Sequence, residues 1–538
     1  MHDILYHPAR AGLPSLKALQ WKRKRLKKAK VAAVCVTSLL ELKQHFLPLE
    51  MPSSLDLIVA DDESGALVAG IATSDVIYIP MPDVYNVEGA CLTGPMQIQW
   101  IGQLKAMPRQ FVLHTDSKFK LHHGDWVLTT LGTHWLRWDA HNRTLSTSFA
   151  PLVYLMCKQH ESVGAGQMLM TAANNICLKY FGAKLEPGAV MADHSSGLHA
   201  AYASVWPDVP FGQCWPHIAR KWSEGEYATK TWEHFDEVLP QLQSIHLAHT
   251  AEMRDLLMAE FGDVWESWGT QMNKFWNTYC REPWDNWSVG LFDCMLCTPS
   301  QQAQETWHRS LLQSKVPNML RGSTAMCFAE TLPQLIEMDA VAIPSILPFH
   351  VPAVPKEMIK KALWYVDNRE THLHIFNPQD CEDQFAYYIL RKDNKSGLKK
   401  IETRLVEMYL AAARGEWDRR IKDLDHLADI CASMHLLVEE DPSWPIPDCE
   451  LNPLRLDCQY CKGFKGYGIC SHVLAVNHIT QKINLRRLVL EIGRSRMHKT
   501  GGGNREKAIP ALQRAPQAEE DSSDEELYAL MEAGRQGR

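Results

Sequence analysis

Apolar runs of strand length alternate with turn residues from about residue 56 onward. The first candidate strands are "LDLIVA", "GALVAGIA" and "DVIYIPMP", and the next are "RQFVLHTDSKFKL", "DWVLTTLGTHWL" and "LSTSFAPLVYLMC". Their length and their content of β-branched and aromatic residues are typical of strands. The last three are joined by short polar connections, so the pattern predicts an antiparallel meander over residues 109–157.

A helical period replaces the strand pattern after the meander. Residues 161–182 carry apolar side chains at helical spacing and end on Gly182, a residue type that often closes helices. A further strand is predicted at 188–194, where it ends on Asp193 and His194, and a short helix should follow. The sequence therefore predicts an α/β domain.

The second half of the chain is mainly helical in period. Residues 218–290 are rich in tryptophan, and we expect a helical insertion whose tryptophans pack in a core instead of stacking on nucleic-acid bases. The helical pattern returns at 300–315 and continues to about residue 436, with a proline-rich interruption at 343–355. We expect domains at 1–55 (basic helical segment), 56–107 (α/β segment), 108–330 (main domain with its insertion), 331–439 (helical region), 440–482 (cysteine-rich unit) and 500–538 (disordered acidic tail).

Size and composition narrow the classes of protein that fit. A chain of 538 residues with 46% hydrophobic residues is long enough for two or more packed domains. No run reaches the ~18 apolar residues that a membrane span needs, and the N-terminus lacks the pattern of a secretory signal. We therefore expect the 15 cysteines to lie in a reducing compartment, where clustered cysteines indicate metal binding or catalysis.

Charge is unevenly distributed along the chain. The net charge of −7 does not indicate bulk binding to nucleic acid, but residues 16–30 carry eight Lys and Arg and no acid. This run could contact phosphates, direct nuclear import, or form a solvated basic helix. It stands at the very start of the chain, which leaves open whether sequence is missing upstream.

The stretch "DCQYCKGFKGYGICSHVLAVNHI" contains the clearest candidate for a metal site. Cys458 with Cys461, and Cys470 with His472, form two closely spaced pairs of the ligand types that zinc prefers. Glycines at 463, 466 and 468 would let the loop between the pairs turn tightly, and Phe464 would pack in a small core. So small a unit needs a metal to fold, so we expect a structural zinc ion here.

This stretch resembles a SWIM-type zinc finger. The family pattern is Cys-x-Cys followed by Cys-x-His and a "CSHVLAV"-like end, which "CKGFKGYGICSHVLAV" matches. The chain departs from the pattern at the first ligand, where Gln459 occupies the family position and Cys458 stands one residue earlier. A Cys-x-x-Cys pair can still chelate zinc, so Cys458 is retained as a ligand.

Three carboxylates lie where strands and helices would bring them together. Asp116 lies on the first strand of the meander, Asp193 ends the strand after the long helix, and Glu305 lies on the helix beyond the insertion. Three such carboxylates can hold two Mg²⁺ ions for phosphoryl chemistry. The order of strand Asp, two strands, helix, strand Asp, strand, helical insertion and helix Glu resembles the ribonuclease-H-like core of DDE transposases.

The local motifs resemble those of the Mutator-like (MULE) transposases over roughly residues 100–480. The matching segments are "TDSKFKL", "ADHSSGLHAAYASVWPDVPFGQCWPHIARK" and "QAQETWH". The first lacks a common Asp-Gly-Thr start, and "SQQAQE" replaces an asparagine-rich lead-in, but neither change removes a carboxylate. The resemblance implies catalytic roles for Asp116, Asp193 and Glu305, with Mg²⁺ as cofactor.

The same resemblance assigns Cys214 and His217 to the family's Cys-x-x-His motif, whose role is left open between bracing the insertion near DNA and simple packing. Cys294 and Cys297 form another Cys-x-x-Cys pair shortly before Glu305. A second zinc ion held by these four residues is a further hypothesis.

The function implied is that of a nuclear Mutator-like DNA transposase that cleaves and transfers DNA strands, acts as a homo-oligomer and does not bind membranes. The zinc finger would aid binding to DNA or protein. A domesticated, non-catalytic DNA-binding regulator, like the plant far-red-response regulators, is the alternative. An interaction protein built on the finger alone would make changes at the carboxylates silent.

Overall fold

The computed structural model describes most of the chain between residues 76 and 490. The described residues are 51, 76–118, 122–123, 126–139, 144–158, 161–223, 235–248, 251–292, 300–313, 322–323, 332, 335–336, 339, 346–347, 354–376, 386–390, 434–439, 450–458 and 461–490. The basic run, the candidate strands "LDLIVA" and "GALVAGIA", the Cys294 and Cys297 pair, and the acidic tail lie outside them.

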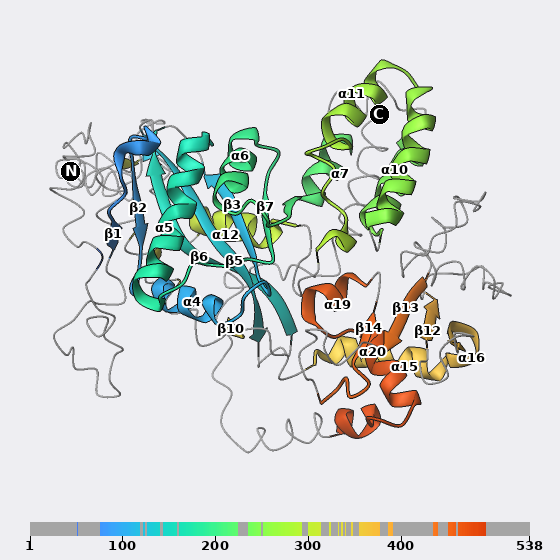
Figure 1. Cartoon of the computed structure of the whole chain (residues 1–538). Coiled ribbons are helices and arrows are strands. Elements are labelled where there is room, and N and C mark those ends of the chain that lie inside the picture. Colours follow the sequence, from blue (N-terminus) through green and yellow to red (C-terminus); the bar gives the residue numbers. More distant parts are fainter. Residues whose placement is uncertain are drawn as a thin grey trace, which may run out of the picture.

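One mixed sheet of eight strands forms the first unit (Figure 1). Its order is β1-β2-β6-β5-β3-β7-β8, and β10 pairs with the far end of β5. The predicted meander is confirmed, because β3, β5 and β6 pair antiparallel, whereas β3, β7 and β8 run parallel. The strands are β1 (Ile77–Ile79), β2 (Gly89–Thr93), β3 (Val112–Lys118), β5 (Val127–Asp139), β6 (Thr144–Cys157), β7 (Ala189–Ala192), β8 (Phe211–Gln213) and β10 (Ile346–Leu347).

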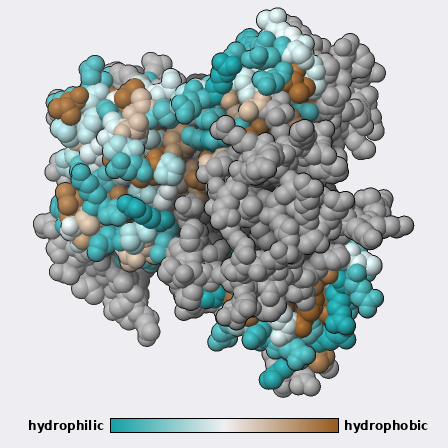
Figure 2. Space-filling model, turned by 45° about the vertical axis from the view of Figure 1, so that its right-hand side comes forward, coloured by the Kyte–Doolittle hydropathy of each residue, from teal (hydrophilic) through white to brown (hydrophobic). Residues whose placement is uncertain are grey.

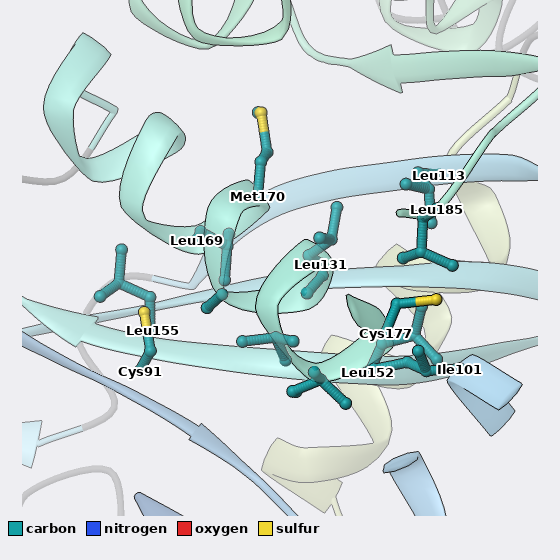
Figure 3. Close-up of a cluster of buried hydrophobic side chains, with 14 of the residues drawn as sticks. Cys91, Ile101, Leu113, Leu131, Leu152, Leu155, Leu169, Met170, Cys177 and Leu185 are labelled. Carbon is teal, nitrogen blue, oxygen red and sulfur yellow. The ribbon is translucent and has the colours of Figure 1, made fainter. Parts of the chain in front are cut away.

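Helices cover both faces of this sheet. On one face lie α4 (Pro95–Lys105), α5 (Val163–Phe181) and α6 (Ser196–Val205), whose apolar residues share a core with the strands. Figure 3 draws Leu169, from α5, together with Leu131 and Leu155 from β5 and β6. The other face carries α12 (Gln302–Gln313), where Trp307 packs against a second core.

Local signals explain where α5 begins and ends. The side chain of Ser162 accepts a hydrogen bond from the Ala165 amide at 3.1 Å, which satisfies one of the free N–H groups of the first turn. At the other end Gly182 has φ +72°, a left-handed conformation that glycine adopts without strain. The helix boundary predicted at Gly182 is therefore confirmed.

The long hairpin of β5 and β6 bends at a bulge. The register shifts between Leu131 and Gly132, opposite Pro151, which lacks an N–H to donate to the ladder. A Cβ on Gly132 would lie 2.3 Å from the carbonyl oxygen of Ala150. Glycine at this position lets the two backbones approach closely where the ladder is interrupted.

The predicted helical insertion lies between β8 and α12. It contains α7 (Trp215–Ser223), α9 (Phe235–His246), α10 (Ala251–Glu266), α11 (Thr270–Tyr279) and the 3₁₀ turn η4 (Val289–Leu291). Trp222, Trp265 and Trp287 are fully buried. These tryptophans pack in the core of the insertion, as predicted.

The C-terminal unit corrects part of the helical region predicted for residues 331–439, of which residues 377–385 and 391–433, among others, lie outside the described structure. Three strands lie there, β11 (Leu373–Phe376), β12 (Ala386–Leu390) and β13 (Met434–Glu439), and they form a four-stranded sheet with β14 (Leu456–Cys458). Short apolar runs such as "AYYIL" fit a strand as well as a helical turn, so periodicity alone did not separate them. The helices of this unit are α15 (Lys356–Asp367), α16 (Arg369–His372), α19 (Lys462–Tyr467) and α20 (Ser471–Ile479).

Three short elements complete the described structure: the 3₁₀ turn η2 (Asp83–Tyr85) and the two-residue strands β4 (His122–His123) and β9 (Gly322–Ser323), which pair with each other. On the face drawn in Figure 2, hydrophobic residues are scattered in small groups among hydrophilic ones. Among the described helices, none is long and apolar enough to cross a membrane.

Candidate active site and metal centre

Asp116 lies on β3 and faces α12. Its Oδ2 atom is 2.9 Å from Nδ1 of His308, a residue of α12 that is almost fully buried. Its Oδ1 atom accepts a hydrogen bond from the Ser117 amide at 2.7 Å. Since a carboxylate only accepts hydrogen bonds, Nδ1 of His308 carries the proton, and Nε2 faces the hydroxyl of Thr130 at 3.4 Å. This geometry holds the Asp116 carboxylate in one orientation.

Asp193 lies beside Asp116 at the carboxyl end of the neighbouring parallel strand. The last pair in the register of β3 and β7 is Thr115 with Ala192. Asp116 and Asp193 are the next residues along the two strands. Adjacent strands lie about 4.8 Å apart, and residues level with each other point to the same face of a sheet. The two carboxylates therefore share one edge of the sheet.

Glu305 joins them from the first turn of α12. His217, from α7, lies between two of the acids, with Nδ1 2.9 Å from Oδ1 of Asp193 and Nε2 3.2 Å from Oε1 of Glu305. Both approaches have ion-pair distances, but neither has the angle of a hydrogen bond. Arg220 adds a positive charge, with Nη2 3.9 Å from Oε2 of Glu305. Asp193 and Glu305 thus flank one imidazole, whereas Asp116 lies on the neighbouring strand against His308. The oxygens of the three carboxylates are not all within 4.8 Å of one another.

Two glutamines fix α12 against the sheet. Gln301 donates from Nε2 to the carbonyl oxygen of Thr115 at 2.9 Å, and Gln304 donates to the Thr130 hydroxyl at 3.0 Å. Sequence reasoning did not assign a role to these residues or to His308. The signal was present in "QQAQETWH", because positions 301, 304, 305 and 308 share one face of a helix.

The Cys-x-x-His pair, Cys214 and His217, lies at the same edge of the sheet. The Cys214 thiol is buried and accepts a hydrogen bond from the Gln301 amide at 3.2 Å, and burial raises the pKa of this thiol. Burial acts to lower the pKa of His217, but Asp193 and Cys214 outweigh it and raise this pKa to about 11. Without a bound metal, this favours the protonated form of His217, which offsets part of the charge of the acids; a metal at Nδ1 would take the place of that proton.

The four predicted zinc ligands come together in the C-terminal unit. One ligand atom from each of Cys458, Cys461, Cys470 and His472 lies within 4.8 Å of the other three, and all four residues are buried. Cys458 ends β14, whereas Cys461 and Cys470 are the residues immediately before α19 and α20. The structure thus brings Cys458 into the group despite its displaced position in the sequence.

His472 turns one ring nitrogen toward the sulfurs and the other away from them. Nδ1 lies 3.5 Å from Sγ of Cys458 and 3.7 Å from Sγ of Cys470. Nε2 lies 3.3 Å from the hydroxyl of Tyr365, on α15. This arrangement leaves Nδ1 as the nitrogen that could bind a metal and gives Nε2 an outer partner.

The thiols form one electrostatic group. Hydrogen bonds from Cys458 and Cys470 lower the pKa of Cys461, whereas burial raises the pKa values of Cys458 and Cys470. Buried sulfurs that share protons in this way fit a divalent ion, since a cation at their centre would replace those protons and relieve the cost of burial. Three sulfurs and one imidazole are a donor set that zinc favours.

The connection between the two ligand pairs differs from the predicted loop. Gly463 and Gly466 lie within the helix α19, and Gly468, with φ +68°, ends it. One of the three glycines therefore provides the tight turn. Phe464 is fully buried beside Cys461 and Cys470, so the predicted miniature core is present.

Comparisons with known proteins add no family to this description. No protein-family model matches the chain, and no curated protein sequence matches it significantly.

Proposed function

We propose that this chain is a Mutator-like DNA transposase, or a recent derivative, that cleaves and transfers DNA strands with Mg²⁺ held by Asp116, Asp193 and Glu305. The observation that carries the proposal is that these carboxylates lie at one edge of the sheet, on β3, at the end of β7 and in the first turn of α12. His217 joins Asp193 to Glu305, and Asp116 contacts His308 on the helix that carries Glu305. The element order also supports it. Strands β3, β5 and β6, helix α5, strand β7, strand β8, a helical insertion and α12 follow the order of a ribonuclease-H-like core.

The donor set suits magnesium. Carboxylate oxygens are the ligands that Mg²⁺ prefers, and the side chains of Asp193 and Glu305 are 40% and 21% exposed, which leaves room for water and phosphate. When bound, two such ions would activate the attacking oxygen and stabilise the leaving oxygen.

The surrounding residues hold this arrangement. His308 orients Asp116, and Gln301 and Gln304 fix the helix that carries Glu305. Arg220 is 43% exposed beside Glu305, where its charge could attract the phosphate backbone of DNA. The zinc finger around Cys458 would serve as a structural module that aids binding to DNA or to another protein in the nucleus, with the transposase acting as a homo-oligomer.

The test is Mg²⁺-dependent strand cleavage and transfer on a DNA substrate carrying the ends of the element. Asp116→Asn, Asp193→Asn and Glu305→Gln should each abolish the reaction, because each removes a charged ligand at nearly constant volume. Asp263→Asn, at an exposed position of α10, is the matched control and should leave the rate unchanged. Strand transfer that survives Asp193→Ala would overturn the assignment.

The same experiment separates the alternative function. A domesticated regulator would bind DNA with unchanged affinity in all three variants and cleave none. An interaction protein built on the zinc finger would neither bind nor cleave DNA.

A further inference from the structure

The edge of the sheet holds a second set of possible metal ligands that differs in chemistry from the three carboxylates. Oxygen from Asp193, sulfur from Cys214 and nitrogen from His217 lie within 4.8 Å of one another. Donor atoms in a tetrahedral zinc site lie roughly 3–4 Å apart, given Zn–ligand bonds of about 2.0–2.3 Å. Only small side-chain shifts would bring these three atoms to such spacing.

Three buried polar atoms in and beside this cluster make no hydrogen bond. Oδ1 of Asp193, Nδ1 of His217 and Oε1 of Glu305 are shielded from solvent, and none has a hydrogen bond among the described residues. Their contacts with each other have ion-pair distances without hydrogen-bond geometry, and buried polar atoms are nearly always hydrogen-bonded. Two of these atoms, on Asp193 and His217, face each other at 2.9 Å.

The outer contacts are those of a metal site. Nε2 of His217 is 3.2 Å from Glu305, so when Nδ1 binds a metal the other nitrogen can donate to a carboxylate. The backbone amide of Gln301 donates to Sγ of Cys214 at 3.2 Å, which stabilises a thiolate. Cys214 is buried, but His217 and Asp193 are 27% and 40% exposed, which leaves one side open for an ion to enter.

We propose that Asp193, Cys214 and His217 form a site for a borderline-soft divalent cation such as Zn²⁺, and that this site and the Mg²⁺ site exclude each other because they share Asp193. A thiolate and an imidazole favour zinc over magnesium, which takes hard oxygen ligands. With three protein ligands, the fourth position of the ion stays open to water. The mutual exclusion rests on the proposed function, whereas the zinc site itself does not.

Metal content of the intact chain tests the site without an activity assay. The chain, purified and equilibrated in a zinc-buffered solution, should hold two zinc ions, one of them in the Cys458 group. Cys214→Ser and His217→Asn should each hold one fewer, and Cys91→Ser, at a buried cysteine of β2, should hold as many as the wild type. An unchanged zinc content in both Cys214→Ser and His217→Asn would overturn the site. Circular dichroism checks that each variant is folded, and the two variants change different ligands, so the test does not depend on either one alone.

Competition tests the shared carboxylate. Excess Mg²⁺ should remove one zinc ion from the wild type and none from Cys214→Ser, and zinc that stays bound would overturn the exclusion. Where strand cleavage is also measured, micromolar Zn²⁺ should inhibit the wild type. The Zn²⁺ concentration that halves the rate should be at least tenfold higher for His217→Asn. A chain without cleavage activity that still loses zinc to Mg²⁺ would refute the proposed transposase and leave the metal site standing.

Discussion

Asp116 and His308 lie 192 residues apart in the sequence, and the Oδ2 atom of the first is 2.9 Å from Nδ1 of the second. The contact joins the first strand of the meander to α12, three residues beyond Glu305. Two of the three predicted catalytic carboxylates are therefore coupled through one helix turn.

Removal of His308 should slow Mg²⁺-dependent cleavage without abolishing it. A hydrogen bond to a charged group contributes about 1.5–3 kcal/mol, so His308→Ala should lower the rate by roughly 10- to 100-fold. His308→Asn keeps an N–H near the position of Nδ1 and should retain more activity at saturating Mg²⁺. Rates measured over a Mg²⁺ titration check this.

The control for His308 is His372→Gln, in the C-terminal unit, which should leave the rate unchanged. Equal losses in His308→Ala and His308→Asn would contradict the role in orienting Asp116, since a merely structural gap would not be repaired by an amide.

The sequence predicted elements whose signals are local. The strands of the meander, the end of α5 at Gly182 and the short spacing of the cysteine pairs are all visible within a few residues. Partners such as His308 for Asp116 and Tyr365 for His472 come from distant segments. No local pattern predicts such pairing, because it depends on how the sheet and helices pack.

Asp339 should make the stability of the protein depend on pH. Burial raises its pKa to about 7, although hydrogen bonds from Trp307 and Tyr154 act to lower it. The unfolded chain, with its ordinary pKa near 4, loses this proton at lower pH than the folded chain does. The contribution of Asp339 to the free energy of unfolding is therefore fully present below about pH 4. It is lost as the pH rises to about 7.

The measurement is thermal unfolding between pH 4 and 8. Asp339→Asn keeps a carbonyl oxygen to accept from Trp307 and removes the titration, so its unfolding free energy should fall less across this range, by an amount on the order of 4 kcal/mol for a shift of ~3 pKa units. Asp263→Asn should keep the wild-type dependence. If the unfolding free energies of Asp339→Asn and the wild type fell in parallel across this pH range, burial would not raise the pKa of Asp339.

Tyr365 should raise the zinc affinity of the Cys458 group. Its hydroxyl lies 3.3 Å from Nε2 of His472 and can accept the proton of that nitrogen, which keeps Nδ1 free for the metal. Loss of an outer partner of a metal ligand costs roughly 10- to 100-fold in affinity. Tyr365→Phe should therefore release zinc to a chelator at correspondingly lower chelator concentration.

The matched change for Tyr365 is Tyr85→Phe, in η2 of the first unit, which should not alter zinc release. Identical chelator curves for Tyr365→Phe and the wild type would mean that the ring position alone, through packing, orients His472.

Zinc removal should unfold the C-terminal unit and spare the large sheet. The apolar core of the unit is built around Cys458, Cys461 and Cys470 themselves, with Phe464 and Leu474 packed beside them. Without the ion, three buried sulfurs must share protons at close range, and the short helices α19 and α20 lose the group that holds their N-termini together. On chelation, the amides of residues 461–479 should therefore lose their protection from hydrogen exchange, while protection in β5 and β6 persists.

Cys458→Ser should give the same loss without chelator, because Cys458 connects this group to β14 and through it to β13. Retained protection and retained zinc in Cys458→Ser would instead assign the site to Cys461, Cys470 and His472 with a different fourth ligand.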